Sequence, residues 1–174
     1  KECNYNHLTQ GFSDVHKAND WGHKYGTFLV APFNCRIVSI VGAESVGPDT
    51  SYLRGGYGVR MQSIEDPTLS AVYWHCLSVF PVSVGDVVLQ GKPVAQMGNS
   101  GFVMVGGKYV EIDIRTIPPY PGTHVHWSMG QNKNGAYTHL DPLQYIDWKI
   151  PVSYDLLTTI KIILQKIANL FNGR

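Results

Sequence analysis

Short runs of β-branched and aromatic residues, separated by glycines and prolines, follow one another from residue 27 to residue 129. This pattern is typical of short strands joined by turns, because β-branched and aromatic side chains favour strands while Gly and Pro favour turns. The 18 Gly and 10 Pro among 174 residues point the same way. We therefore expect a mainly β domain, with strands in the runs 27–32 (TFLVAP), 35–43 (CRIVSIVGA), 56–63 (GYGVRMQS), 70–77 (SAVYWHCL), 85–90 (GDVVLQ), 92–98 (KPVAQMG), 108–115 (KYVEIDIR) and 123–129 (THVHWSM).

The run 108–115 shows the clearest alternation of apolar and charged residues. A period of two predicts a strand with one face toward the core and one toward solvent. The apolar face comprises Val110, Ile112 and Ile114, and the charged face comprises Glu111, Asp113 and Arg115. We expect no regular structure in residues 117–122 (IPPYPG), because proline fixes φ and removes a backbone donor.

The end of the chain has apolar residues at helical spacing. Asp141 followed by Pro142 predicts the start of a short helix, since proline suits the first helical position. Residues 154–171 are expected to form an amphipathic helix, with an apolar face of Leu156, Ile160, Ile163, Leu164, Ile167 and Phe171. The chain then divides into a β domain at 1–150 and a helical appendage at 151–174, which packs on its own domain or docks on a partner.

The composition excludes several classes of protein. Fourteen Lys and Arg face thirteen Asp and Glu, and a net charge of +1 argues against binding nucleic acid through a basic surface. A hydrophobic fraction of 44% argues against disorder. Three cysteines make no disulfide framework, and no apolar stretch reaches the roughly 18 residues that a membrane-spanning helix needs. The chain begins KECNYN, without Met or a signal peptide, so we expect a processed piece of a longer protein.

Two short motifs place histidines where they can meet a metal ion. In the sequence HVH at 124–126, both imidazoles lie on one face of a strand, because strand side chains alternate with period two. His16 and Asp20 add a nitrogen and an oxygen donor four residues apart. Three such ligands are typical of a catalytic zinc, which keeps one position open for water. His75, which we expect within a strand, is a further imidazole.

Each of these motifs is weak when taken alone, because surface or core histidines at such spacings are common. The sequence contains no CxxC pair, which argues against a cysteine-rich zinc site. It also lacks HExxH and HxxEH, which excludes the helical zinc-peptidase motifs. From the residues alone, the sequence predicts a β-rich domain with a candidate His/His/Asp site.

The order of these motifs along the chain resembles that of the LytM/lysostaphin-type M23 metallopeptidases. The matching stretches are 16–22 (HKANDWG), 26–42 (GTFLVAPFNCRIVSIVG), 55–63 (GGYGVRMQS), 71–101 (AVYWHCLSVFPVSVGDVVLQGKPVAQMGNSG), 122–129 (GTHVHWSM) and 140–146 (LDPLQYI). Together they fall within residues 10–147. The resemblance implies an antiparallel β-sheet core of the duplicated-hybrid-motif-like type, with a groove along the site. It also implies hydrolysis of peptide cross-links or stems in bacterial peptidoglycan.

The resemblance further implies a role for each residue of the site. His16, Asp20 and His126 correspond to the metal ligands, with Zn²⁺ as the cofactor. His124 corresponds to the general base that takes a proton from the attacking water. His75 corresponds to a second catalytic histidine, which stabilises or protonates the tetrahedral intermediate. These roles suit imidazole, which exchanges protons near neutral pH.

The chain departs from the family pattern in several places. Residues 102–121 intervene before the HVH motif, and we expect them to form an inserted hairpin or a wall of the groove. Ala18 stands where family members often have glycine, and no tyrosine can be assigned to the transition state. The helix expected at 154–171 lies outside the resemblance. With this C-terminal addition and no signal peptide, the chain is similar to the endopeptidase domain of a phage tail-associated wall-degrading enzyme, a morphogenesis protein.

The narrower resemblance implies a location in a virion tail or outside the cell, and action on the cell wall. The 154–171 helix would then contact other domains or tail proteins. The alternative is a catalytically silent M23-like module that binds the wall or builds the tail, and the presence of all five site residues favours the enzyme. The cleaved bond stays open among Gly–Gly, D-Ala–Gly and D-Ala–diaminopimelate linkages.

We expect no catalytic role for the other histidines, the aromatic residues and the cysteine near the motifs. The histidines expected at the surface are His7, His23 and His139. The aromatic residues expected in the core are Tyr73, Trp74 and Trp127. Cys76 should also face the core, because neighbours in a strand point to opposite faces, and this argues against thiol chemistry.

Overall fold

The computed structural model describes residues 7–42, 55–111, 115 and 117–145. The elements in chain order are β1 (Leu8–Gln10), β2 (Asn19–Trp21), β3 (Phe28–Val30), β4 (Cys35–Val41), β5 (Gly58–Ser63), β6 (Leu69–Trp74), β7 (Val87–Val88), β8 (Pro93–Gln96), β9 (Met104–Val105), β10 (Lys108–Tyr109), β11 (Val125–Lys133), β12 (Ala136–Leu140) and the helix α3 (Pro142–Tyr145). All pairings between these strands are antiparallel, which confirms the predicted mainly β fold.

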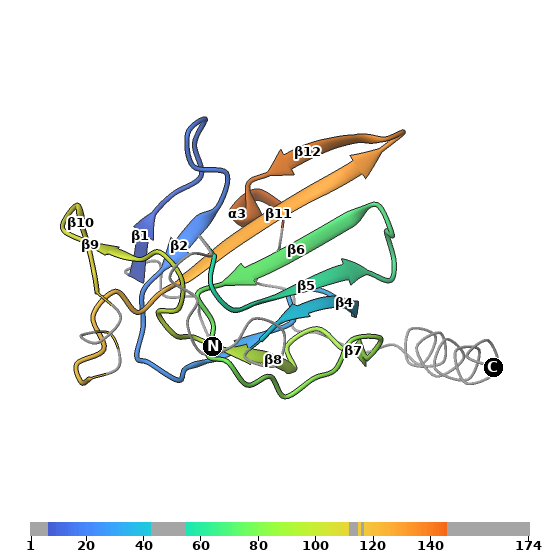
Figure 1. The fold of residues 1–174 in the computed structure, drawn as a ribbon. Helices are drawn as coiled ribbons and strands as arrows, with labels where there is room; N and C mark the ends of the chain where they lie inside the picture. Colours follow the sequence, from blue (N-terminus) through green and yellow to red (C-terminus); the bar gives the residue numbers. More distant parts are fainter. Residues whose placement is uncertain (1–6, 43–54, 112–114, 116, 146–174) are drawn as a thin grey trace.

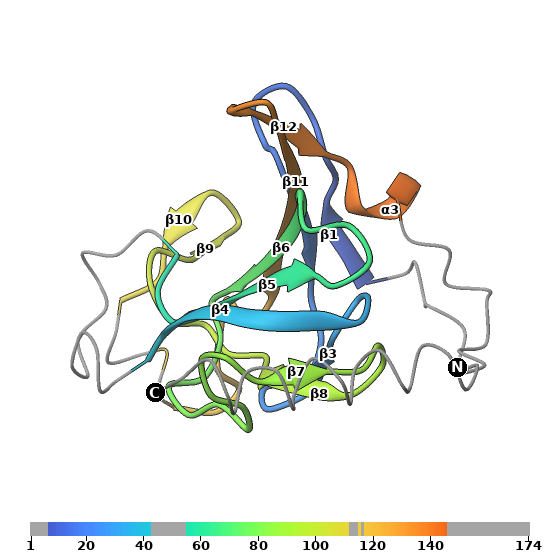
Figure 2. The same ribbon diagram turned by 90° about the vertical axis from the view of Figure 1, so that its right-hand side faces the viewer.

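The main sheet brings together strands that are far apart in the sequence. Its order is β1-β2-β11-β6-β5-β4-β7, and β12 joins it by pairing with β11 (Figure 1). β11 therefore lies between β2 and β6, which come from much earlier in the chain. The pair β3–β8 lies below β4 (Figure 2). β9 and β10 form a separate hairpin, as expected for the insertion 102–121.

The hydrophobic core joins the main sheet to the β3–β8 pair. Ile37, Met61 and Met129 of the main sheet are fully buried, and so is Val94 of β8. Burying an aliphatic side chain of this size stabilises a fold by about 1.5–3 kcal/mol. The hydroxyl of Tyr73 donates a hydrogen bond of 2.8 Å to the carbonyl of Val30 and so ties β6 to β3.

The helix α3 begins where the sequence predicts it, at Pro142. The carboxylate of Asp141 caps it by accepting a hydrogen bond of 3.0 Å from the backbone N–H of Leu143. The same oxygen accepts a hydrogen bond of 2.9 Å from the side chain of Asn19, which links the helix to β2. The amphipathic helix predicted at 154–171 lies outside the described residues. Within them, no helix has the length and apolar character that crossing a membrane requires.

The predicted strand 108–115 is wrong in its extent. Among its described residues, only Lys108 and Tyr109 form a strand, β10, and they pair with Val105 and Met104 of β9. Val110 is buried as expected, while residues 112–114 lie outside the described part of the chain. Arg115 was assigned to an exposed face, yet only 4% of its surface is accessible. Its guanidinium finds hydrogen-bond acceptors inside the fold, and these acceptors override the alternation of the sequence.

Candidate metal centre

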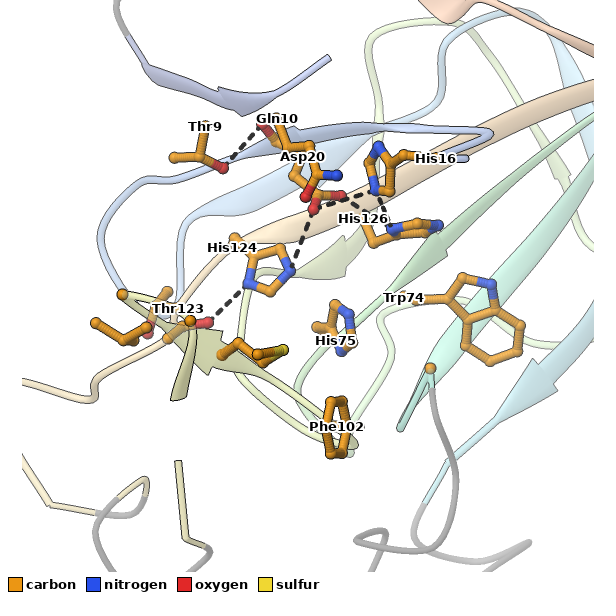
Figure 3. A pocket seen from close by; sticks show the side chains of 16 residues that line it. Thr9, Gln10, His16, Asp20, Trp74, His75, Phe102, Thr123, His124 and His126 are labelled. Atoms are coloured by element: carbon orange, nitrogen blue, oxygen red, sulfur yellow. Dashed lines mark hydrogen bonds and ion pairs between the residues drawn. The ribbon is translucent and has the colours of Figure 1, made fainter. Parts of the chain in front are cut away.

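One row of side chains crosses four strands on the groove face of the sheet. The row consists of four residues that are cross-strand partners in succession: Gln10 on β1, Asp20 on β2, His126 on β11 and Trp74 on β6. All four line a groove of about 1230 Å³ (Figure 3). The alternating neighbours, which face the core, are Asn19, Trp127 and Tyr73. Strand alternation together with this register therefore sets Asp20 beside His126.

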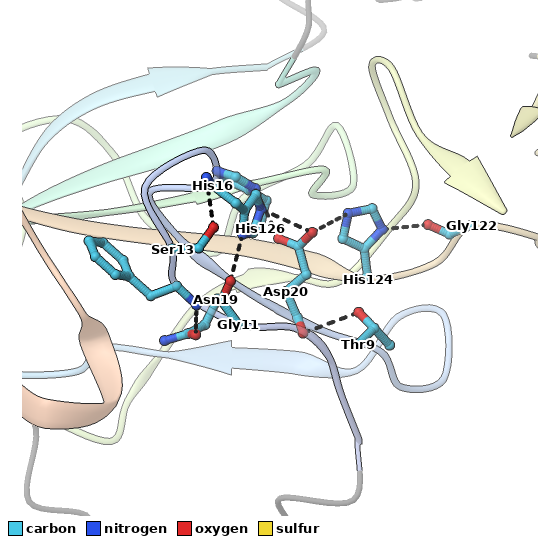
Figure 4. Close-up of polar contacts among 10 residues, drawn as sticks. Thr9, Gly11, Ser13, His16, Asn19, Asp20, Gly122, His124 and His126 are labelled. Atoms are coloured by element: carbon cyan, nitrogen blue, oxygen red, sulfur yellow. Dashed lines mark hydrogen bonds and ion pairs between the residues drawn. The ribbon is translucent and has the colours of Figure 1, made fainter. Parts of the chain in front are cut away.

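Three ligand atoms converge at this row, two from its strands and one from a neighbouring loop. Nδ1 of His126 lies 2.9 Å from Oδ1 of Asp20 and 3.3 Å from Nε2 of His16 (Figure 4). Nε2 of His16 lies 3.3 Å from Oδ2 of Asp20. All three ligand atoms are within 4.8 Å of one another. The structure thus brings together the three residues that the resemblance names as metal ligands.

His16 comes from the loop between β1 and β2, and that loop is fixed by hydrogen bonds. The backbone N–H of His16 donates 3.1 Å to the hydroxyl of Ser13. Nδ1 of its ring lies 3.2 Å from the carbonyl of Gly11. A carbonyl only accepts, so we assign the ring proton to Nδ1, which leaves the lone pair of Nε2 facing the carboxylate.

The charges of this cluster fit a bound cation. Oδ1 of Asp20 is buried, and within the described residues it accepts no hydrogen bond of good geometry, although Nδ1 of His126 approaches to 2.9 Å. We attribute this to an approach that is out of line for hydrogen bonding. Lone pairs of two imidazoles and a carboxylate repel one another at such distances unless a positive charge lies among them. Two nitrogens and one carboxylate match the ligand set of a catalytic zinc.

The carboxylate of Asp20 is ionised at neutral pH. Burial by itself would raise the pKa of Asp20, but the side-chain contact with His126, and the positive charge that His126, His124 and His16 carry when protonated, outweigh burial and hold this pKa below its ordinary value. The ligand set therefore carries one negative charge, which a divalent cation more than compensates.

Two further histidines flank the ligand set. Nδ1 of His124 lies 2.7 Å from the carbonyl of Gly122, and Nδ1 of His75 lies 2.7 Å from the carbonyl of Ser100. Each carbonyl only accepts, so both Nδ1 atoms carry a hydrogen and both Nε2 atoms carry a lone pair. The two ring centroids are 4.5 Å apart, and Nε2 of His124 is 3.9 Å from Oδ2 of Asp20. The structure therefore gathers all five predicted site residues at one groove.

His75 differs from its prediction in backbone conformation. It was expected within a strand, but β6 ends at Trp74, and His75 has a φ of 61°. Its N–H donates 2.8 Å to the carbonyl of Gly55, and its carbonyl accepts 2.9 Å from the N–H of Gly98. A Cβ on Gly98 would lie 2.9–3.0 Å from backbone atoms of His75 and Cys76, so only glycine fits this approach. The left-handed turn at His75 aims the imidazole into the groove.

The core assignments near the site are mostly confirmed. Tyr73, Cys76 and Trp127 are buried, although Cys76 follows the turn at His75 and does not owe its position to strand alternation. The assignment of Trp74 to the core is wrong, because its partly buried indole lines the groove. A Cβ on Gly58 would lie 2.4 Å from an indole carbon of Trp74, so this glycine makes room for the ring.

The three surface histidines lie apart from the groove lining, as expected. His7 and His23 are exposed, and their rings meet edge to face at 5.1 Å. His139 is exposed on β12, with its ring 5.1 Å from that of Tyr137. Sequence reasoning missed other residues of the site, above all Gln10 in the groove and Asn99 and Ser100 behind His75. Asn99 and Ser100 lie in the GNSG turn of the matched stretch 71–101, but the motif assigned them no role behind His75, and the sequence held no signal for Gln10.

The insertion 102–121 supplies one wall of the groove. Phe102, Met104 and Val105 line it and keep 48%, 49% and 52% of their surface exposed. Thr9 and Thr123 also line the groove. The prediction that the insertion lines the groove is therefore confirmed.

The burial of His75 favours its neutral form and should make the stability of the fold depend on pH. Burial, reinforced by the charge of His124, lowers the pKa of His75 to about 3, whereas the unfolded chain has the ordinary value of 6.5. Below pH 6.5 the unfolded state therefore binds more protons, so stability is present above about pH 6.5 and declines as the pH falls toward 3. We expect the melting temperature of the chelator-treated protein to fall less steeply with acid in His75→Asn than in wild type.

Asparagine is chosen because, like histidine, it tolerates a positive φ. The matched control is His139→Asn, which removes an exposed histidine and should keep the wild-type slope. Equal slopes in all three proteins, measured by thermal melts from about pH 7.5 to pH 4, would contradict this account of His75.

The chain has no match among family models and none among curated proteins. Its fold is shared with solved structures. LytU is 22% identical with a TM-score of 0.57, and the match covers 80% of this chain and 83% of that chain. The catalytic domain of the antimicrobial peptidase lysostaphin from Staphylococcus simulans is 22% identical with a TM-score of 0.52, covering 75% of this chain and 77% of that chain. A zinc-containing peptidase from Vibrio cholerae is 15% identical with a TM-score of 0.52, covering 83% of this chain and 37% of that chain. The fold is therefore that of the LytM/lysostaphin M23 peptidases, as predicted.

Proposed function

We propose that this chain is a zinc-dependent endopeptidase that hydrolyses peptide cross-links or stems of bacterial peptidoglycan. The observation that carries the proposal is the convergence of one His/Asp/His donor set and two further imidazoles at a single groove. The fold shared with the peptidase lysostaphin and with a zinc-containing peptidase supports it. The alternative of a catalytically silent wall-binding module does not account for the two imidazoles with free Nε2 atoms.

In the proposed site, His16, Asp20 and His126 hold the zinc ion. Zinc supplies Lewis acidity when bound, which polarises the substrate carbonyl and makes water more acidic. The three residues contribute two neutral nitrogens and one ionised oxygen. They come from a loop and two adjacent strands, so the sheet sets the spacing of two of them.

His124 is the proposed general base. Its Nδ1–H is committed to the carbonyl of Gly122, so its Nε2 is free to take a proton from the attacking water. The proton then passes to the amine nitrogen as the peptide C–N bond breaks. His75 is the proposed second catalytic histidine, which stabilises or protonates the tetrahedral intermediate. Its ring lies beside that of His124, and its Nδ1–H is committed to Ser100.

Digestion of purified cell walls tests this function. We expect the protein to bind about one zinc ion per chain. We also expect it to release muropeptides from walls of at least one cross-link type, and a chelator should stop the release. Mass spectrometry of the products identifies the bond among Gly–Gly, D-Ala–Gly and D-Ala–diaminopimelate. If zinc-loaded protein bound the walls but left all three types intact, the silent module would be the better description.

We further propose a setting for the enzyme, which rests on the sequence resemblance. It would act at the cell wall from a phage tail, or otherwise from outside the cell, for local wall penetration. In that arrangement residues 1–150 are the peptidase domain, and the appendage 151–174 contacts other domains or tail proteins. Removing the appendage should then abolish co-assembly with the partner and leave zinc content unchanged. Intact co-assembly after truncation would contradict the assigned role of the appendage.

A further inference from the structure

The insertion carries a buried arginine whose contacts the peptidase chemistry does not explain. Arg115 exposes 4% of its surface, and Nη1 of its guanidinium donates to the carbonyl of Asn99 at 2.9 Å and to the carbonyl of Gly101. Its Nη2 donates a hydrogen bond of 3.2 Å to the hydroxyl of Tyr109, and its Cζ lies 5.6 Å from the centroid of the Tyr109 ring. Arginine is almost never fully buried without a partner. No carboxylate of the described residues pairs with it, so backbone carbonyls are its main partners.

The side chain of Asn99 makes hydrogen bonds back to the insertion. Its side chain exposes little surface, and its Nδ2 donates 3.0 Å to the backbone carbonyl of Arg115 and 2.9 Å to that of Pro121. The two residues therefore bind each other twice, once through each side chain. The amide of Asn99 also reaches Pro121 at the end of the insertion, so the pair fastens the second half of the insertion, at residues 115 and 121, to one turn.

The segments that this pair holds are those that orient the two histidines. Asn99 and Gly101 flank Ser100, whose carbonyl accepts the Nδ1–H of His75. Pro121 precedes Gly122, whose carbonyl accepts the Nδ1–H of His124. The hydroxyl of Ser100 is itself fixed, since it accepts 2.9 Å from the N–H of Tyr57 and donates 2.8 Å to the carbonyl of Cys76.

We propose that Arg115 and Asn99 are positioning residues that hold His75 and His124 in their Nδ1–H tautomers with both Nε2 atoms aimed at the groove. This inference rests on the proposed function. Neither side chain needs to touch substrate, because each holds a carbonyl next in the chain to the one that accepts a hydrogen bond from an imidazole. The insertion is then required for turnover as well as for the groove wall. A shift of about 1 Å in catalytic groups can cost about 100-fold in rate, so a loose carbonyl is enough to slow the reaction.

Kinetics on the zinc-loaded protein provide the first test. We expect Arg115→Lys and Asn99→Ala to lower kcat by about 10- to 100-fold and to leave zinc content unchanged. KM should change far less, because neither side chain lines the groove. Lysine keeps the charge but loses the planar fork of donors, so charge alone should not restore the rate. The matched control is Arg60→Lys, at an exposed arginine of β5, which should behave as wild type.

A second test needs no activity. Nitrogen NMR of the metal-free protein at neutral pH reports which ring nitrogen carries the hydrogen. His75 and His124 should be Nδ1–H tautomers in wild type and in the Arg60→Lys control, and mixtures in Arg115→Lys and Asn99→Ala. Thermal melts identify variants that fold, and Tyr109→Phe, which removes only one hydroxyl, gives a milder variant with a smaller expected effect.

The outcomes separate this inference from the proposed function. Wild-type protein that cleaves no wall would overturn the function, while the tautomers would still decide the positioning role. Active wild-type protein, with folded Asn99→Ala showing unchanged kcat and unchanged tautomers, would overturn the positioning role alone.

Discussion

Replacing Asp20 by asparagine is expected to abolish zinc binding and to reduce wall hydrolysis to background. The substitution keeps the shape of the side chain but removes the only negative charge of the proposed ligand set. Asparagine also introduces an amide N–H₂ group, which repels a cation if it replaces the carboxylate oxygen that faces the histidines. Zinc should therefore raise the melting temperature of the wild-type protein and leave that of Asp20→Asn unchanged, since a ligand stabilises only the state that binds it.

The matched control is Asp14→Asn, in the loop that precedes His16. Asp14 is exposed and pairs only with the side chain of Lys17 at 3.1 Å among the described residues. Surface pairs of this kind contribute about 0–1 kcal/mol, so its loss should change neither zinc content nor activity. Metal analysis and melting curves with and without added zinc measure both variants. A full zinc complement in Asp20→Asn would remove this residue from the ligand set.

Of the strands that build the site, β6 and β11 could be predicted because their signals are local, whereas β1 and β2 lie before residue 27, where no strand was predicted. The HVH motif lies in a β-rich run, and its His126 faces the groove while Trp127 faces the core, as a period of two requires. The link between His16 and Asp20 on one side and His126 on the other came from motif order. The residues themselves gave no reason for β2 to pair with β11, because pairings between distant strands are set by the whole sheet.

The failures share a different cause, which is tertiary hydrogen bonding. His75 leaves the strand pattern because its backbone bonds to Gly55 and Gly98, two residues that lie far from it in the sequence. Arg115 leaves the predicted charged face because carbonyls near Ser100 accept its donors. Side-chain periodicity describes a strand with partners along its length. It does not predict which side chains are buried in the insertion, where β10 and its partner strand β9 pair over only two residues.

Removing His124 is expected to separate metal binding from catalysis. In His124→Ala, the three ligand atoms of His16, Asp20 and His126 remain, so zinc content should match wild type. Hydrolysis should fall by about 100- to 10,000-fold, which is the usual contribution of a positioned general base. The measurement is muropeptide release per zinc-loaded chain, compared with His139→Ala, which removes an exposed histidine from β12.

Asp20→Asn and His124→Ala are expected to differ in zinc content, and this difference distinguishes a metal ligand from a general base. Asp20→Asn should lose zinc and activity together, whereas His124→Ala should keep zinc and lose activity. If His124→Ala retained more than about a tenth of the wild-type rate, the base would have to be another group that faces the same reacting atoms. His75 is then the candidate, because its Nε2 also carries a lone pair and its ring lies 4.5 Å from that of His124. A low pKa makes His75 a weak base, so its variant would have to show the larger loss before the two roles are exchanged.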